Sequence, residues 1–90
     1  MLIWGFKMVF PTVHLNGTSR AVLLDANQKA ARAIADAIEA LHDAAPNARD
    51  YYVQGVDAYS QAAFAHARRL SGLYEVFREV KQIIEHLENP

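Results

Sequence analysis

Residues 56–87 read VDAYSQAAFAHARRLSGLYEVFREVKQIIEHL, and their apolar side chains recur at alternating steps of three and four residues. Such steps place side chains on one side of an α-helix and, over several repeats, form a heptad stripe. The stripe contains Val56, Tyr59, Ala63, His66, Leu70, Leu73, Phe77, Val80, Ile84 and Leu87. A helix of this length spans roughly 45–50 Å, and it must bury its stripe against another element.

An earlier heptad stripe predicts a partner helix over residues 19–44. Its members are Leu24, Asn27, Ala31, Ile34, Ile38, Leu41 and Ala45. Thr18 or Ser19 can cap its start, because a hydroxyl accepts a hydrogen bond from a backbone N–H that has no partner in the first turn. Pro46 ends it, because proline has no N–H to donate to the helical ladder.

The second helix is predicted over residues 57–88, with Asp57 as its N-cap, and a loop over residues 45–56 joins it to the first. We therefore predict an all-α fold, a long antiparallel two-helix hairpin of the coiled-coil type, within a single domain of residues 1–90.

The connection also sets the expected register. If Ala44 at the end of the first helix lies beside Asp57 at the start of the second, Asn27 faces the region of residues 73–74, where Tyr74 is its expected hydrogen-bond partner. His66 then faces residues 34–35. The second helix then extends past the start of the first, so residues 83–87 are left for the N-terminal segment to cover.

The apolar band of the second helix is wider than a two-helix hairpin needs. Val76, Ile83 and Tyr74 lie beside the main stripe, and a band of this width is typical of a bundle. We expect a homodimer that forms a four-helix bundle, or a higher helical bundle. The residues expected to set oligomeric state and register are Asn27, His66, Leu70, Leu73, Phe77, Val80 and Ile84.

Residues 1–18 are predicted to form an extended arm and a turn. The side chains on one side of the extended segment are Leu2, Trp4, Phe6, Met8 and Phe10. We expect these aromatic residues to cover the core, with partner binding through Trp4 and Phe6 as the alternative. Asn16-Gly17 predicts the turn. A biological start at Met8 would make residues 1–7 an addition to the native chain.

The composition argues against several classes of function. The net charge is −1, with acidic and basic residues mixed, whereas a nucleic-acid binder needs a clustered basic face. The absence of cysteine excludes disulfides and thiolate chemistry. No apolar run is long enough to span a membrane, and no signal peptide is recognised, so we expect a cytoplasmic protein.

No catalytic, cofactor-binding or metal site is predicted, so the protein is interpreted as a non-enzyme without cofactors. Glu39 and His42 form one Glu-x-x-His motif, which is half of the pair found in carboxylate metal sites of helical bundles. They flank the stripe, however, and the second helix has no matching motif. Glu85 and His86 are interpreted as part of a solvated tail. For His66, a ligand or pH-switch role is the alternative to a structural contact with a partner helix.

Contact residues for an unidentified protein partner are expected near the loop. Arg49, Tyr51, Tyr52 and Phe64 are residue types that anchor protein interfaces. The alternative is that the tyrosines close the open end of the hairpin, and we expect one inside and one outside.

Two segments resemble a known family. Residues 12–19, TVHLNGTS, and residues 45–55, APNARDYYVQG, resemble the signature segments of a family of small phage and prophage proteins that has no assigned function. The resemblance covers residues 12–87 and implies that a helix follows each segment. The chain departs from the family pattern at Ala21, where an acidic residue is common, and at Ala48, where glycine is usual.

The resemblance implies a viral or prophage setting. The expected function is a host-directed adaptor or inhibitor that acts by protein–protein interaction in the host cytoplasm. A structural component of a virion or assembly complex is the alternative, and a nucleic-acid-binding accessory protein is the weaker third.

Overall fold

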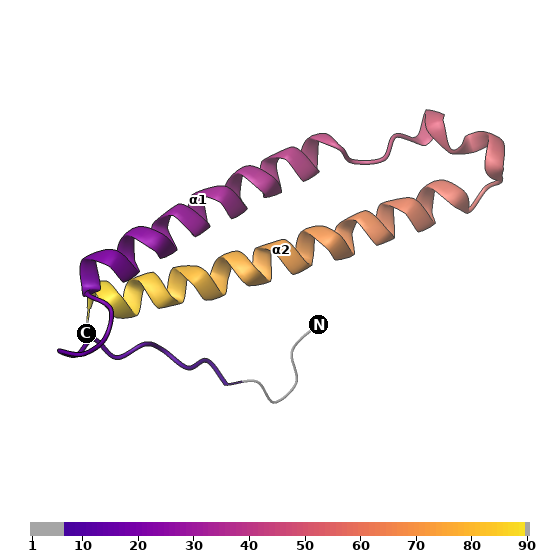
Figure 1. The fold of residues 1–90 in the computed structure, drawn as a ribbon. Helices are drawn as coiled ribbons and strands as arrows, with labels where there is room; N and C mark the ends of the chain where they lie inside the picture. The colour runs from indigo at the N-terminus through magenta and orange to yellow at the C-terminus, as the bar shows by residue number, and fades with distance from the viewer. Residues whose placement is uncertain (1–6, 90) are drawn as a thin grey trace.

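The computed structural model describes residues 7–89, which form two α-helices joined by a folded connection (Figure 1). α1 (Arg20–Asp43) and α2 (Ala58–Glu88) run antiparallel, and the connection contains two short 3-10 turns, η1 (Ala48–Asp50) and η2 (Tyr52–Gln54). No strand occurs in this described part of the chain. The predicted all-α hairpin is confirmed.

The helix ends lie within one residue of the predicted bounds. Ser19 Oγ accepts a hydrogen bond from the Val22 backbone N–H at 3.2 Å, so Ser19 and not Thr18 caps α1. Asp57 occupies the N-cap position of α2, but its side chain makes no capping bond. Its backbone carbonyl instead accepts a bond from Ser60 Oγ at 3.0 Å.

The register of the hairpin differs from the predicted one. His42 Nε2 lies 3.2 Å from the Tyr74 hydroxyl, and Arg20 donates to the Leu87 carbonyl at the other end of the helix pair. Figure 1 shows that α2 extends past the C-terminal end of α1, alongside the connection. The prediction that the helices leave the connection at the same level is therefore wrong.

Side-chain size explains this register. The first turns of α2 are rich in alanine, which buries little apolar area, whereas residues 70–87 carry the large side chains of its stripe. The observed register places residues 70–87 against α1 and leaves the alanine-rich turns to the connection. His66 is about 12 Å along the helix from Tyr74. It therefore lies level with the connection, and the prediction that it faces Ile34 is wrong.

Few apolar side chains of the hairpin are buried. In the described residues these are Ala31, Ile38, Ile84 and Leu87. Val56 and Tyr59, the first two members of the second stripe, are 96% and 40% exposed, so the expectation that the whole stripe is buried is wrong at its start. The other large stripe residues are half-exposed, because a hairpin covers each helix on one side only. They are Leu24, Ile34, Leu41, Leu70, Leu73, Phe77 and Val80. The radius of gyration is 18.2 Å, whereas a compact chain of this length has about 12 Å.

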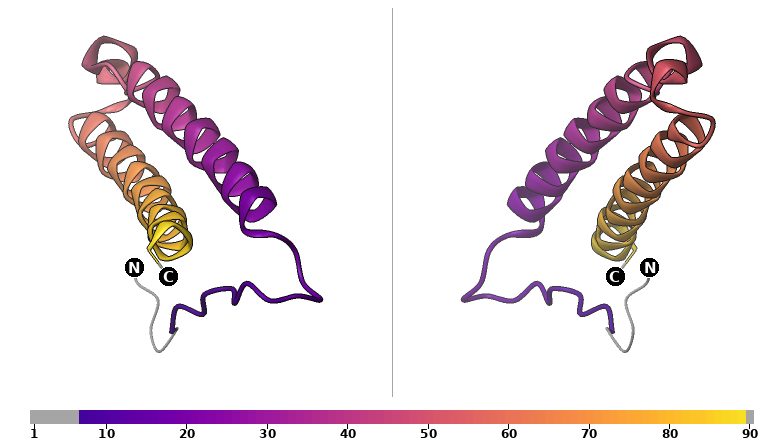
Figure 2. Two further views of the ribbon diagram at one scale, coloured as in Figure 1. Left: turned by 90° about the vertical axis from the view of Figure 1, so that its left-hand side faces the viewer. Right: turned by 90° about the vertical axis from the view of Figure 1, so that its right-hand side faces the viewer.

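The described part of the arm crosses the end of the hairpin where α1 begins and α2 ends (Figure 2). The Phe10 ring stacks on the His86 ring, with centroids 4.9 Å apart and an interplanar angle of 17°. The Pro11 carbonyl accepts a hydrogen bond from His86 Nε2 at 3.0 Å. Met8 and Phe10 are half-buried and Val9 between them is exposed, which is the alternation of an extended chain.

A turn connects the arm to α1. The Gly17 N–H donates to the His14 carbonyl at 3.1 Å, which closes the turn predicted at Asn16-Gly17. Leu15 stands at this turn and is 98% exposed. Trp4 and Phe6, the arm residues predicted to cover the core or bind a partner, lie outside the described residues.

Candidate functional site: the tip surface and the closed end

The described residues contain no cluster of His, Asp and Glu side chains that could hold a metal ion. Glu39 and His42 are exposed on α1, and the His42 ring contacts the Tyr74 ring edge-on, with centroids 6.2 Å apart. None of the described helices is long and apolar enough to cross a membrane.

The ion pairs of the described residues are local. Lys29 Nζ lies 2.9 Å from the Asp25 carboxylate one helical turn away, and Arg78 pairs with Glu75 in the same manner. Exposed pairs of this kind contribute about 0–1 kcal/mol each. Neither pair joins the two helices, so the hairpin depends on its apolar stripes.

Four large apolar side chains in the connection and the first two turns of α2 are strongly exposed. Tyr52, Val53, Val56 and Phe64 are 73%, 77%, 96% and 73% exposed. These four residues are called the tip surface below. Tyr52 and Phe64 are residues that the sequence nominates for partner binding, whereas the two valines are not. In the sequence, Val56 belongs to the heptad stripe of the second helix and Val53 to the loop, and their only other signal is that two β-branched residues lie near Gly55.

The backbone of the tip surface is fixed by hydrogen bonds and by Gly55. The Gln54 N–H donates to the Tyr51 carbonyl at 3.0 Å, and the Gly55 N–H donates to the Tyr52 carbonyl at 3.4 Å. Gly55 has φ 122° and ψ 170°, a region that is essentially restricted to glycine. The exposed side chains of residues 52–56 therefore project from an ordered turn.

The two tyrosines of the connection lie in different environments. Tyr51 is half-buried, and its ring lies 6.5 Å from the Tyr59 ring at an interplanar angle of 54°. Tyr52 is exposed, so one tyrosine packs inward and the other faces solvent, as the sequence analysis expects. Arg49 is exposed, and its guanidinium forms no ion pair within the described part of the chain.

Asn27 and His66, the polar residues in the two stripes, differ in their hydrogen bonding. Asn27 Nδ2 donates to the Leu23 carbonyl of its own helix at 2.9 Å, so the predicted pairing with Tyr74 is wrong. His66 is 8% exposed, and its Nε2 has no hydrogen-bond partner among residues 7–89. A buried polar atom without a partner costs about 1–3 kcal/mol.

The other residues expected to set oligomeric state differ in burial. Ile84 is buried in the hairpin, and the half-exposed members are Leu70, Leu73, Phe77 and Val80. Within one chain these four are covered on one side by α1, and each keeps apolar area that another helix can cover.

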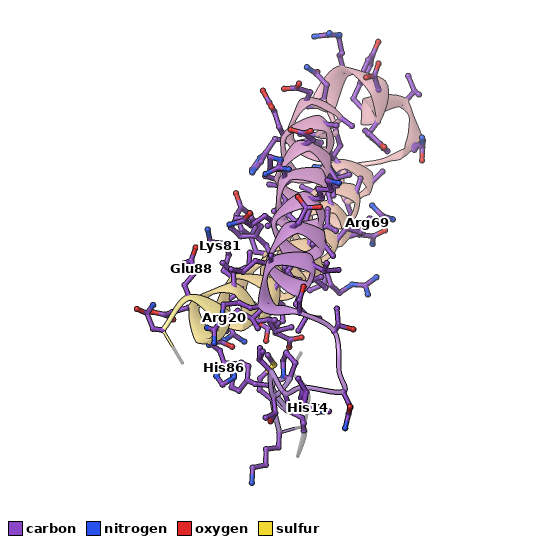
Figure 3. The ribbon with its side chains drawn as sticks, turned by 60° about the vertical axis from the view of Figure 1, so that its left-hand side comes forward. His14, Arg20, Arg69, Lys81, His86 and Glu88 are labelled. Carbon is purple, nitrogen blue, oxygen red and sulfur yellow. The ribbon has the colours of Figure 1, made fainter. Side chains whose placement is uncertain are left out.

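The opposite end of the hairpin is closed by the arm and by α1, and its residues Phe10, Arg20, His86 and Leu87 are called the closed end below. The Arg20 guanidinium donates to the Leu87 carbonyl, one of the last carbonyls of α2, which lack a partner within the helix. Figure 3 shows Arg20 and His86 together at this end. Because His86 is half-buried and bonded to the arm, its interpretation as part of a solvated tail is wrong.

A small hollow remains between the arm and the helix ends. It measures about 220 Å³, and the residues that line it are Thr12, Val13, Arg20, His86 and Leu87. One guanidinium nitrogen of Arg20 and the Nε2 of His86 are bonded to backbone carbonyls, and both bonds join separate segments of the chain. The closed end therefore has the properties of a structural joint.

Comparison with models of known families, with curated proteins and with solved structures finds no match to this chain. The resemblance of residues 12–19 and 45–55 to a phage family therefore stays a prediction.

Proposed function

We propose that the protein acts without catalysis, by binding another protein through the tip surface. The observation that carries the proposal is the exposure of four large apolar side chains at one end of the hairpin, each at least 73% exposed. Exposed apolar groups that gather at one place commonly mark an interaction site, and aromatic side chains supply much of the binding free energy at such sites.

The ordered backbone of the tip surface supports this proposal. Binding costs conformational entropy when a loop must become ordered, and a loop that is already held in one conformation avoids most of this cost. The 3-10 turn η2 and Gly55 hold residues 52–56 in such a conformation. Arg49 is exposed at the same connection and can pair with an acidic group at the rim of the interface.

On the resemblance to phage proteins, we propose that the partner is a protein of the host cytoplasm and that the chain is an adaptor or inhibitor. The alternative is a component of a virion or assembly complex, in which Trp4 and Phe6 of the arm would contact a neighbouring subunit. A virion component would co-purify with particles, whereas an adaptor would be found with a host protein in the soluble fraction. Binding to nucleic acid, the third possibility, would be detected as retention on DNA at low salt.

A matched pair of variants tests the proposal. In the first, Tyr52, Val56 and Phe64 are changed to serine; in the second, Val9 and Leu15, exposed apolar residues of the arm, are changed to serine. Each tagged chain is used for affinity capture with quantitative mass spectrometry.

We expect a specific protein that binds the native chain and the arm variant, and that binds the tip variant at least about tenfold less, the effect of losing one or two anchor residues. Capture of the same proteins in equal amount by the tip variant would contradict the proposal. Circular dichroism of both variants verifies that helix content is unchanged.

A further inference from the structure

The two long edges of the hairpin differ in polarity. His42 of α1 and Tyr74 of α2 are in contact, so both lie on one edge of the helix pair. Helical periodicity places Gln28 of α1 and Lys81 of α2 on the same edge. This edge is called the polar edge. Its larger side chains are polar, namely Gln28, His42, Tyr74 and Lys81, and the small Ala35 lies among them.

The opposite edge is apolar along both helices. The line along which α1 and α2 touch separates two edges of the helix pair. Because the helices are antiparallel, the positions that lie on the other side of this line from His42 and Tyr74 form the second edge. Helical periodicity places Leu23, Ala30, Ala37, Val76 and Ile83 there, beside the half-exposed Ile34, Leu41, Leu73 and Val80. These residues are called the apolar edge. Figure 3 shows Lys81 on one side of α2 and Arg69, the one charged residue that this periodicity assigns to the apolar edge, on the other.

We propose that a second copy of the chain covers the apolar edge and that two hairpins form a four-helix bundle. Ala30 and Ala37 have small side chains, so a helix of the second copy can approach α1 closely. The proposal does not rest on the proposed function, because the apolar edge and the tip surface share no residue.

The exposed area of the elongated chain is large enough for an interface with a second copy. The chain exposes 6800 Å², whereas a compact monomer of 10.1 kDa exposes roughly 5300 Å². The excess of roughly 1500 Å² is larger than the roughly 800 Å² that each partner contributes to a specific interface.

The small core also favours a second copy. The large apolar side chains buried within the described residues are Ile38, Ile84 and Leu87, which is little for a chain of this length. Such a hairpin needs its apolar edge covered whenever it is folded. A second copy is present whenever the first is made, whereas another protein need not be. The net charge of −1 gives little repulsion between two copies.

The oligomeric state of the full chain in solution tests the proposal. By sedimentation velocity and light scattering we expect twice the chain mass of 10.1 kDa at micromolar concentration. A helical chain that keeps the monomer mass up to hundreds of micromolar would overturn the proposal. So would a larger species of fixed mass.

Two matched pairs of lysine variants test which edge of the hairpin forms the interface between the two copies. Val76 and Tyr74 are 46% and 49% exposed on the same helix, on the apolar and the polar edge respectively. Ala37 and Ala35 are both exposed on α1 and are related in the same way. We expect Val76→Lys and Ala37→Lys to raise the dimer dissociation constant at least about 100-fold, because each buries an unpaired charge in the interface. Tyr74→Lys and Ala35→Lys should change it less than about threefold.

Equal effects of the two members of each pair would overturn the assignment of the interface to the apolar edge. Folding and association can be coupled, so circular dichroism is recorded at the concentration of each mass measurement. Loss of helix on dilution of Val76→Lys, with helix restored together with dimer at high concentration, supports the proposal. An apolar-edge variant, Val76→Lys or Ala37→Lys, that stays dimeric at the native dissociation constant contradicts it.

Discussion

The two ends of the hairpin differ in how much apolar surface they cover. At the closed end, Leu87 is 1% exposed, the Phe10 ring covers His86, and the last turn of α2 is bonded to Arg20. At the other end, Val56 is 96% exposed and the tip surface has no covering element within the described residues. The closed end therefore contributes stability, whereas the tip surface is available for binding. Four predictions test this difference.

The largest effect is expected at Leu87. Leu87→Ala removes the most buried side chain of the described residues and leaves a cavity, so we expect a loss of about 2–5 kcal/mol in the free energy of unfolding. Leu15→Ala, at a side chain that is 98% exposed, is the matched control and should change it by less than about 0.5 kcal/mol. Urea denaturation followed by circular dichroism measures both. Equal losses for the two variants would show that the burial of Leu87 at the closed end does not contribute the stability assigned to it.

Alanine substitutions at two glycines test backbone strain at the tip and helix propensity in α2 separately. Gly55→Ala places a side chain at φ 122° and should cost about 1–3 kcal/mol, although no atom lies within 4 Å of the added methyl. Gly72→Ala, inside α2 and equally free of neighbours, should stabilise the chain by about 0.5–1 kcal/mol. Thermal unfolding of the two variants should therefore shift in opposite directions. A stabilised Gly55→Ala variant would show that the turn at the tip is not held in the described conformation.

The buried His66 gives the third test. Its Nε2 has no partner within the described residues, so His66→Leu removes an unsatisfied polar atom and should raise the free energy of unfolding by up to about 2 kcal/mol. Ala67→Leu, at the exposed neighbouring position, should change it by less than about 0.5 kcal/mol. A loss of stability in His66→Leu under chemical denaturation would mean that His66 has a partner in the assembled protein.

The smallest effect on stability is expected at the tip surface. Val53→Ser and Phe64→Ser remove side chains that are 77% and 73% exposed, so each should change the free energy of unfolding by less than about 0.5 kcal/mol. The proposed function expects substitutions at the tip to reduce partner capture. A loss above about 1 kcal/mol in the free energy of unfolding would show that these side chains are packed in the core. The two ends of the hairpin would then not differ as described.

The two helices and their ends could be predicted from the sequence because local signals fix them. The three- and four-residue steps of residues 56–87 define α2, Ser19 supplies a capping hydroxyl, and Pro46 cannot continue α1. Each of these signals acts over one or two helical turns, so one sequence is enough to read it.

The register could not be predicted in the same way because it depends on the connection and on side-chain volume. Residues 45–56 read as an irregular loop, but they form two 3-10 turns that lie alongside the first turns of α2. The choice between pairing His42 with Tyr59 and pairing it with Tyr74 depends on which α2 side chains fill the space beside α1. The heptad spacing of the two stripes is the same in either register, so the spacing alone does not predict which register forms.

The candidate site was predicted in part for a related reason. Tyr52 and Phe64 could be nominated because aromatic residues near a loop are common contact anchors. Val53 and Val56 could not, because their exposure follows from the fold of the connection and from Gly55. The hydrogen bond between His86 and the Pro11 carbonyl joins residues far apart in sequence, so no local sequence pattern predicts it.

The difference between the two ends depends on α2 running past α1 beside the connection. The chain has no cysteine, so a pair of introduced cysteines gives an unambiguous crosslink. A short thiol crosslinker should join the His42→Cys, Tyr74→Cys pair within one chain, as a monomer-sized band on a denaturing gel, and should not join His42→Cys with Tyr59→Cys. The reverse result would contradict the register and, with it, the assignment of the tip surface and the closed end.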